Sequence, residues 1–307
     1  MRAYILIIVA ILFFSGNFIV GKIMVDNIPA FTLSFLRCSI AFLIMVLLAR
    51  KDWKNHRGVL LRNWKTIYAL SLTGIVFFIG LVYFSLHYTT TINASIVEAS
   101  TPIFASILGL ILLKERLLFL QYVGIVVSFI GVLWIVTSGS VQQLLSLQFN
   151  VGDLLMVIAV LAWCVYSILV KKHMGRLPTK GSLMVMLGMA CITLLPFVVV
   201  EWIILDITIN WNTTTILSVL YLGIFPSIIA IICWNKGVEA VGASKAAVCL
   251  NLIPVFTTIQ AVLILNERIY IEQLLGGVLV IIGVLLTTKL RSSEKVSHSL
   301  LKKQEIN

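Results

Sequence analysis

The chain has 307 residues, of which 60% are hydrophobic and only 11% are charged. Because soluble globular proteins are about 25% charged, this composition excludes an ordinary soluble domain. The net charge of +11 does not indicate nucleic-acid binding, since the Lys and Arg residues cluster in short segments between long apolar runs and in the C-terminal tail. We therefore expect the chain to lie in a lipid bilayer and to bind no nucleic acid.

Ten apolar segments of about 20 residues follow one another, which is the length that a helix needs to cross about 30 Å of hydrocarbon. Their apolar runs are continuous rather than alternating, which favours helices over a β-barrel. The first segment has no clear cleavage site, so we expect a retained span and not a signal peptide. The expected spans are 3–21, 30–49, 66–86, 93–113, 119–137, 152–171, 181–200, 214–234, 244–265 and 270–289.

Basic residues between the spans predict the orientation of the chain. Residues 50–65 hold six Lys and Arg residues, residues 171–180 hold four, and the tail from Lys289 holds five. The intervening loops hold none. By the positive-inside rule, both termini lie in the cytoplasm, and residues 290–307 form a basic cytoplasmic tail.

An internal repeat becomes visible when the sequence is shifted by 152 residues. Pro102 then aligns with Pro254, and Glu115–Arg116 aligns with Glu267–Arg268. A shift of 149 residues gives a weaker match over the first spans of each half. Each half holds five spans, and because five is odd, the second half enters the membrane from the opposite side.

This pattern predicts an all-α integral membrane protein with ten transmembrane helices in two inverted five-helix repeats, residues 1–137 and 138–289. Many secondary transporters have this architecture, bind substrate between the repeats, and expose the site to each side in turn. The sequence contains no ATP-binding motif, so a gradient of substrate, proton or another ion would supply the energy.

The repeated motifs resemble the drug/metabolite transporter superfamily, in its ten-span EamA-type branch. The resemblance extends over residues 3–289. It implies a transporter of small metabolites in the bacterial inner membrane, in a family where many members export amino acids or related compounds. The residues that carry it are Asn17, Phe18, Lys22, Arg37, Ala41, Ala94, Pro102, Glu115, Ala246, Pro254 and Glu267.

Glu98 is the main candidate for the substrate pathway. It lies six residues inside the fourth span, roughly 9 Å deep at 1.5 Å per residue, where an ionisable side chain is costly and usually functional. Arg37 lies at a similar depth in the second span. If the two side chains pair, they orient a charged or zwitterionic substrate, or they merely tie the two spans together. If Glu98 is unpaired, it is a candidate proton carrier, which makes a proton the candidate coupling ion.

Further polar and aromatic side chains are candidates for the same pathway. They are Asn17 in span one, Tyr83 and His87 near the outer end of span three, Trp163 and Tyr166 in span six, and Asn251 in span nine. We expect Tyr83 and His87 to line one vestibule. Trp163 and Tyr166 are expected to form an aromatic wall, a packing contact or part of an aromatic belt at the membrane interface. Leu250 occupies the position equivalent to Glu98, so the acid is not duplicated.

The repeated proline and Glu-Arg motifs are interpreted as structural. Pro102 and Pro254 are expected to kink their helices, because proline leaves a backbone carbonyl without its partner. Glu115–Arg116 and Glu267–Arg268 are expected to form helix-end turns on opposite faces of the membrane.

Other functions stay open. Multidrug efflux of lipophilic cations would need an acid in an aromatic pocket without a compensating cation, and Arg37 argues against it. A lipid-linked-sugar flippase is a further alternative. The sequence contains no HExxH, GxSxG or GxxxxGK[ST] motif and no Cys/His cluster, so we expect no enzyme, no metal site and no cofactor.

Overall fold

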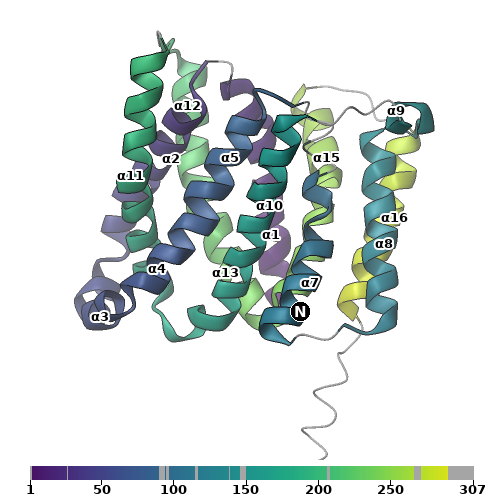
Figure 1. Cartoon of the computed structure of the whole chain (residues 1–307), viewed down its shortest axis with the longest axis horizontal. Coiled ribbons are helices and arrows are strands. Elements are labelled where there is room, and N and C mark those ends of the chain that lie inside the picture. The colour runs from purple at the N-terminus through teal and green to yellow at the C-terminus, as the bar shows by residue number, and fades with distance from the viewer. Residues whose placement is uncertain are drawn as a thin grey trace, which may run out of the picture.

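A computed structural model of the chain describes residues 2–25, 27–89, 94, 97–114, 117–137, 139–145, 150–205, 208–265 and 271–289. The helices pack side by side, and no strand occurs in these ranges (Figure 1). α1 begins and α16 ends at the lower end of Figure 1, where the Tyr4 hydroxyl donates to the Thr288 carbonyl at 3.2 Å. We call the two ends of the bundle the lower end and the upper end, as drawn in that view.

The helical elements of the first half are α1 (Arg2–Val25), α2 (Ala30–Leu48), α3 (Arg50–Arg62), α4 (Trp64–Ser71), the π-helical η1 (Leu72–Phe77), α5 (Phe78–Ser85), α7 (Thr101–Leu113) and α8 (Phe119–Val136). After the short α9 (Val141–Leu145), those of the second half are α10 (Val151–His173), the 3₁₀ turn η2 (Met174–Arg176), α11 (Thr179–Ile204), α12 (Thr213–Ile224), the π-helical η3 (Phe225–Ala230), α13 (Ile231–Val241), α14 (Ala243–Cys249), the 3₁₀ turn η4 (Leu250–Leu252), α15 (Ile253–Leu265) and α16 (Ile271–Lys289). Both halves are therefore built from helices joined by short connections.

Seven helical segments within the described residues are long and apolar enough to cross a membrane. They match the predicted spans one, two, three, five, six, seven and eight, and they are Arg2–Val25, Ala30–Leu48, Trp64–Ser85, Phe119–Val136, Val151–Arg176, Thr179–Ile204 and Thr213–Val241. The predicted span four contains α7, span nine contains α14 and α15, and span ten contains α16. In spans four and ten, the apolar helical stretches that the structure describes are shorter, namely Val97–Leu113 and Leu274–Thr288. The all-α membrane class is thus confirmed, and the count of ten spans stays a prediction.

The predicted spans four and nine each depart from regular α-helical geometry just before a proline. The chain makes a turn at Ser100, and α7 starts immediately afterwards with Pro102 in its first turn. In span nine, α14 passes into η4, and Pro254 is the second residue of α15. The cause is the same in both, because proline has no N–H group and its ring clashes with the carbonyl four residues earlier.

Residues 50–65 are mostly helical, although the sequence suggested a loop. α3 carries Lys and Arg side chains towards solvent and buries Leu60, which is 1% exposed. It is seen end-on at the lower left of Figure 1. The many charged residues of this segment led to its interpretation as a loop. Its charged residues and the buried Leu60 nevertheless form an amphipathic pattern, which is typical of a helix at a membrane surface.

Two carboxylates hold α2 and α11 together at opposite ends of this antiparallel pair. At the upper end, Glu201 of α11 accepts hydrogen bonds from the backbone N–H groups of Phe31 and Thr32, at 2.9 and 2.8 Å. At the lower end, Asp52 of α3 accepts one from the N–H of Gly181, at 3.1 Å. Glu201 of α11 thus caps the N-terminal turn of α2, and Asp52 of α3 caps that of α11, where unpaired N–H groups and the helix dipole favour negative charge.

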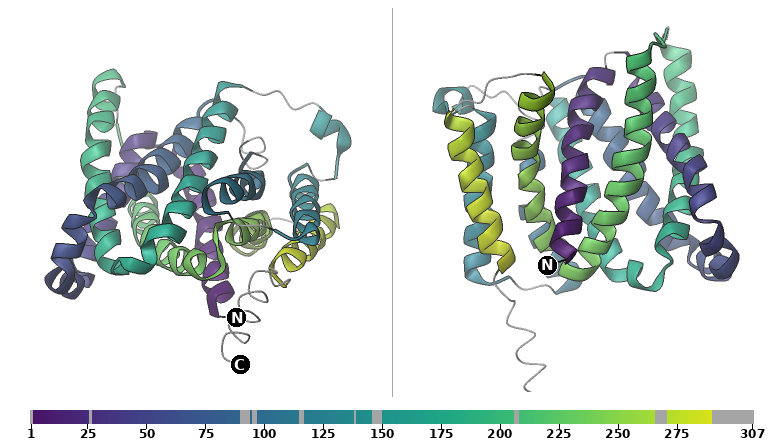
Figure 2. Two further views of the ribbon diagram at one scale, coloured as in Figure 1. Left: turned by 60° about the horizontal axis from the view of Figure 1, so that its bottom comes forward. Right: turned by 180° about the vertical axis from the view of Figure 1, so that it is seen from behind.

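α8 and α16 form a second antiparallel pair, which stands at one side of the bundle (Figure 2). Glycines make the close approach possible. A Cβ atom at Gly124 would lie 2.6 Å from the Gly283 carbonyl oxygen, and one at Gly131 would lie 2.8 Å from the Gly276 carbonyl oxygen. The contacts are reciprocal, since a shift of 152 residues relates Gly124 to Gly276 and Gly131 to Gly283.

Candidate functional site

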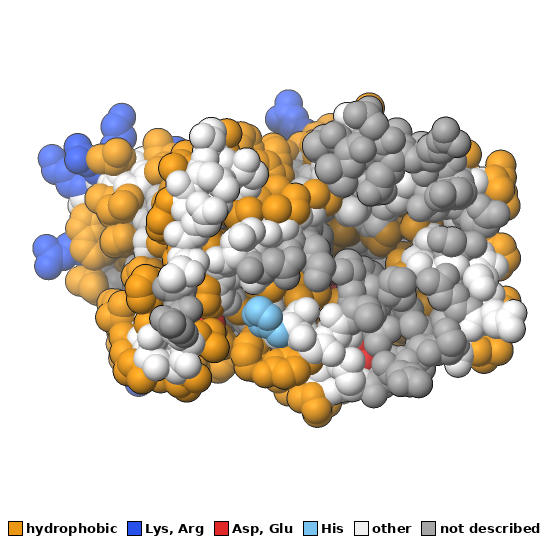
Figure 3. All heavy atoms as spheres, turned by 90° about the horizontal axis from the view of Figure 1, so that it is seen from above, with side chains coloured by type: hydrophobic (Ala, Val, Ile, Leu, Met, Phe, Trp, Pro, Cys, Tyr) orange, Lys and Arg blue, Asp and Glu red, His pale blue; other side chains and the backbone are white. Residues whose placement is uncertain are grey.

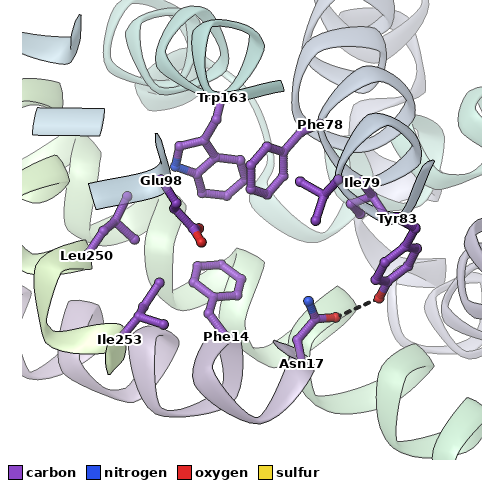
Figure 4. A pocket seen from close by; sticks show the side chains of 10 residues that line it. Phe14, Asn17, Phe78, Ile79, Tyr83, Glu98, Trp163, Leu250 and Ile253 are labelled. Atoms are coloured by element: carbon purple, nitrogen blue, oxygen red, sulfur yellow. Dashed lines mark hydrogen bonds between the residues drawn. The ribbon is translucent and has the colours of Figure 1, made fainter. Parts of the chain in front are cut away.

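A cavity in the middle of the bundle contains Glu98. This central cavity is shown in Figure 4, and the free space among its lining atoms, including space open to the outside, is about 410 Å³. Its lining residues come from α1, α5, α10, residues 97–99 and the ninth span, and they are Phe14, Asn17, Phe78, Ile79, Val82, Tyr83, Glu98, Trp163, Leu250 and Ile253. The Glu98 carboxylate points into the cavity beside the Phe14 ring, and Asn17 and Tyr83 lie at the other end.

An adjoining cavity of about 410 Å³ contains Arg37, and we call it the arginine cavity. It shares five lining residues with the central cavity, namely Phe14, Asn17, Phe78, Ile79 and Trp163. The two cavities therefore lie on either side of one aromatic wall. Trp163 of the predicted span six lines both cavities and packs on Phe78, with ring centroids 4.6 Å apart.

Arg37 is buried, with 3% of its surface exposed, and it bonds only to neutral side chains in the described part of the chain. Its Nη1 donates to Asn17 Oδ1 at 2.6 Å and to the Tyr83 hydroxyl at 2.7 Å, while its Nε donates to the Ser227 hydroxyl at 2.9 Å. Its other terminal nitrogen, Nη2, has no hydrogen bond within the described residues. The positive charge is thus held in place without being neutralised.

Glu98 and Arg37 do not pair with each other. Within the described residues, the Glu98 carboxylate has neither an ion pair nor a hydrogen bond. The backbone explains its placement, because Glu98 lies in a helical segment directly before the turn at Ser100, and the Thr101 hydroxyl donates to its carbonyl. Of the alternatives drawn from the sequence, the structural ion pair is therefore excluded in this conformation.

Two buried Asn–Tyr hydrogen bonds occupy matching positions in the two halves. The Tyr83 hydroxyl donates to Asn17 Oδ1 at 3.0 Å, and the Tyr166 hydroxyl donates to Asn235 Oδ1 at 2.5 Å. The shifts of 149 and 152 residues relate Asn17 to Tyr166 and Tyr83 to Asn235, so the two residue types are exchanged. Tyr166 is therefore a packing and hydrogen-bonding residue beside the cavity and does not line it.

His87 and Tyr83 line two different cavities in the described part of the chain, although their spacing suggested one vestibule. His87 lines a separate, open vestibule of about 1570 Å³ near the upper end, together with Phe31, Phe84 and Glu201. The spacing argument failed because Tyr83 turns inward to Arg37, while His87 lies beyond the end of α5. Figure 3 looks down on this end, where Lys and Arg side chains appear mainly at the left edge.

The remaining predicted residues have other positions. Asn251 is buried outside the central cavity, where its Nδ2 donates to the Ser128 hydroxyl at 2.8 Å. Glu115, Arg116, Glu267 and Arg268 lie outside the described residues, so their role as helix-end turns stays a prediction. Sequence reasoning missed Ser227, which accepts a hydrogen bond from Arg37. Its position directly after Pro226, in a span with few polar residues, could have marked it as a candidate.

A helical membrane bundle with adjoining internal cavities, one lined by an unpaired carboxyl side chain and the other by a buried arginine, has the architecture of a small-molecule transporter. Comparison with known families agrees. The profile of the EamA-like transporter family matches residues 1–137 and 150–289. The chain belongs to the EamA-like transporter family, as the resemblance of its motifs predicted.

Relatives with curated names are transporters as well. The chain is 29% identical to an uncharacterized transporter of Archaeoglobus fulgidus, over 94% of this chain and 97% of that protein. It is 27% identical to a probable amino-acid metabolite efflux pump of Escherichia coli, over 87% of this chain and 88% of that protein. A solved crystal structure has the same fold, with a TM-score of 0.76 and 20% identity, over 94% of this chain and 96% of that one.

Proposed function

We propose that this transporter exports amino acids or related small metabolites by alternating access between two inverted five-helix repeats. The single observation that carries the proposal is the pair of opposite charges, Glu98 and Arg37, which line adjoining cavities and do not neutralise each other. A zwitterionic substrate supplies the two missing partners at once. The amino-acid efflux pump among the relatives supports the same substrate class.

The polar atoms around the cavities suit the two ends of an amino acid. The Glu98 carboxylate faces the ammonium group, and the aromatic rings of Phe14 and Trp163 add cation–π attraction. At the other end, the Asn17 amide nitrogen points into the cavity, and Arg37 Nη2 is a second donor without a partner in the described residues. Both donors suit a carboxylate, since hydrogen bonds to ionised groups are the strong ones.

Energetics favour this arrangement over a purely structural role. An unpaired charge inside the membrane is costly, by about 2.5–3.5 kcal/mol on insertion scales. Two such charges close to each other would gain by pairing, yet the Arg37 hydrogen bonds to Asn17, Tyr83 and Ser227 hold them apart. We infer that the bound substrate pairs its ammonium group with Glu98 and its carboxylate with Arg37, so that binding depends on both side chains.

A second candidate function is efflux of lipophilic cations. It is favoured by the aromatic lining around Glu98, which has no cationic partner in the described residues. The buried charge of Arg37 next to the same wall opposes it, because a second cation would be repelled. Amino-acid export therefore accounts for both charges, and cation efflux for only one.

The orientation in the membrane belongs to the same proposal. We place the protein in a bacterial inner membrane with both termini in the cytoplasm, so that the lower end is cytoplasmic. The basic helix α3 at this end and the positive-inside rule support this placement. A proton is the candidate coupling ion.

The test is an export assay in cells that overproduce the protein, with amino acids and small metabolites measured in the medium. Wild type is compared with Glu98→Gln and with Glu239→Gln, which removes a charge from an exposed position at the end of α13. We expect one or more amino acids to accumulate with wild type and Glu239→Gln but not with Glu98→Gln. A change confined to tolerance of cationic dyes would support the second candidate instead.

A further inference from the structure

A third cavity reaches Glu98 from another direction. This side cavity of about 700 Å³ lies between α8, η4, α15 and residues 98–99. It is lined by Glu98, Ala99, Ile135, Val136, Leu250, Asn251, Ile253, Pro254, Thr257 and Thr258. Glu98, Leu250 and Ile253 line the central cavity as well, so the carboxylate lies at the boundary between the two spaces.

The side cavity offers oxygen atoms that have no partner elsewhere in the described structure. Asn251 is 1% exposed, and its Oδ1 is buried without a hydrogen bond. The Thr257 and Thr258 hydroxyls make none either within the described residues. Helical threonines usually donate to the carbonyl four residues earlier, as Thr193 does to Met189 at 2.9 Å. The Thr257 and Thr258 hydroxyls in α15 make no such bond in the part of the chain that the structure describes, so their two oxygen atoms are available to bind a ligand in the side cavity.

The charge around the side cavity is that of a single carboxylate. Glu98 is the only titratable side chain among the described residues that line the side cavity. Tyr83 lines the central cavity instead, and Arg37 lines the arginine cavity. One negative charge with neutral oxygen ligands matches one monovalent cation. The site also lies beside η4, where the ninth span departs from α-helical geometry, and transporters commonly bind coupling ions at irregular segments of their helices.

We propose that the side cavity is the binding site and access route of the coupling cation, a proton or a sodium ion, which reaches Glu98 without passing through the central cavity. Asn251, Thr257 and Thr258 hold the cation or the water that carries it, and Glu98 supplies the charge. Substrate and cation then approach the same carboxylate from opposite sides. This inference rests on the proposed transport function but concerns a different cavity.

The test needs no substrate. Dicyclohexylcarbodiimide, an apolar reagent, reacts with protonated carboxyl groups in apolar surroundings, and mass spectrometry of the full-length protein in detergent measures the labelled fraction of Glu98. The labelling is followed across pH in choline chloride and in sodium chloride. Glu98→Gln identifies the labelled peptide.

Two conservative variants probe the side cavity, and one serves as a matched control. Thr257→Val and Thr258→Val each remove a hydroxyl and keep the shape, while Thr193→Val makes the same change on α11, where the hydroxyl already has a partner. Monodisperse elution of each variant in size-exclusion chromatography shows that it is folded.

If the cation is sodium, sodium chloride protects Glu98 in the wild type, and the half-protecting concentration rises about tenfold in one or both side-cavity variants, which corresponds to about 1.4 kcal/mol. If the cation is a proton, sodium does not protect, and the pH of half-maximal labelling shifts by at least about half a unit in these variants. Thr193→Val matches wild type in both cases.

The proposal is overturned if both side-cavity variants label like wild type at every pH and sodium concentration. That result would leave amino-acid export intact, because the export assay depends on the central cavity. Conversely, a failed export assay together with altered labelling would refute the substrate assignment and keep the cation site.

Discussion

The two carboxylate caps on the α2–α11 pair give a quantitative prediction. Glu201 accepts three hydrogen bonds, from the N–H groups of Phe31 and Thr32 and from the Thr32 hydroxyl at 2.9 Å, whereas Asp52 accepts one, from Gly181. A hydrogen bond to a charged group contributes about 1.5–3 kcal/mol. We therefore expect Glu201→Ala to lower the free energy of unfolding by about 3–5 kcal/mol, and Asp52→Ala by about 1.5–2 kcal/mol.

The distance between the caps makes a second, independent check possible. α2 has 19 residues and is therefore about 28 Å long. Sites this far apart act additively within about 0.5 kcal/mol, so the double variant should lose the sum of the two single losses. Glu201→Gln keeps an acceptor and should recover part of the loss.

Thermal unfolding in detergent measures these losses, with a dye that fluoresces on reaction with thiols as the reporter. The free cysteines Cys38, Cys164 and Cys249 are buried in the fold and become reactive only on unfolding. At about 2–4 °C per kcal/mol, Glu201→Ala should lower the Tm by roughly 10 °C and Asp52→Ala by roughly 5 °C. Equal losses for the two variants, or a loss below about 1 kcal/mol for Glu201→Ala, would refute the capping argument.

Two further predictions concern packing and the arginine network. Gly276→Ala should lower the Tm by several degrees, because its Cβ would lie 2.8 Å from the Gly131 carbonyl oxygen and overpacking costs about 1–3 kcal/mol. Gly277→Ala is the control, since its Cβ would contact only the end of the Val255 side chain, at 3.9 Å. An equal fall in Tm for the two variants would contradict the close contact between α8 and α16. Ser227→Ala removes one of the hydrogen bonds of Arg37, so it should reduce amino-acid export several-fold and lower the free energy of unfolding by about 1.5–3 kcal/mol. Unchanged export in a folded Ser227→Ala protein would show that the arginine position is not critical.

Residue patterns were sufficient for the features that depend on local chemistry. The apolar runs predicted the long helices, and the depth of Glu98 predicted that it lies inside the bundle. Pro102 and Pro254 predicted interrupted helices, because the missing N–H group acts within one turn.

The features that were missed depend on contacts between distant segments. Ser227 reaches Arg37 across 190 residues, from a π-helical segment that no propensity predicts. Glu201 and Asp52 looked like ordinary loop residues, although the shift of 149 residues aligns them and could have drawn attention to a shared role. The sequence left open whether Glu98 meets Arg37, because equal depth on two helices does not specify which way the side chains turn.

The central claim is that one substrate engages Glu98 and Arg37 through two opposite charges. The most direct test is transport into proteoliposomes of the amino acid found by export profiling, beside its methyl ester, which keeps only the positive charge, and its N-acetyl form, which keeps only the negative one. We predict that wild type transports the free amino acid at least tenfold faster than either derivative, and that Arg37→Gln loses the discrimination against the ester. Transport of the ester by wild type as fast as the free amino acid would contradict the account and identify a transporter of cations.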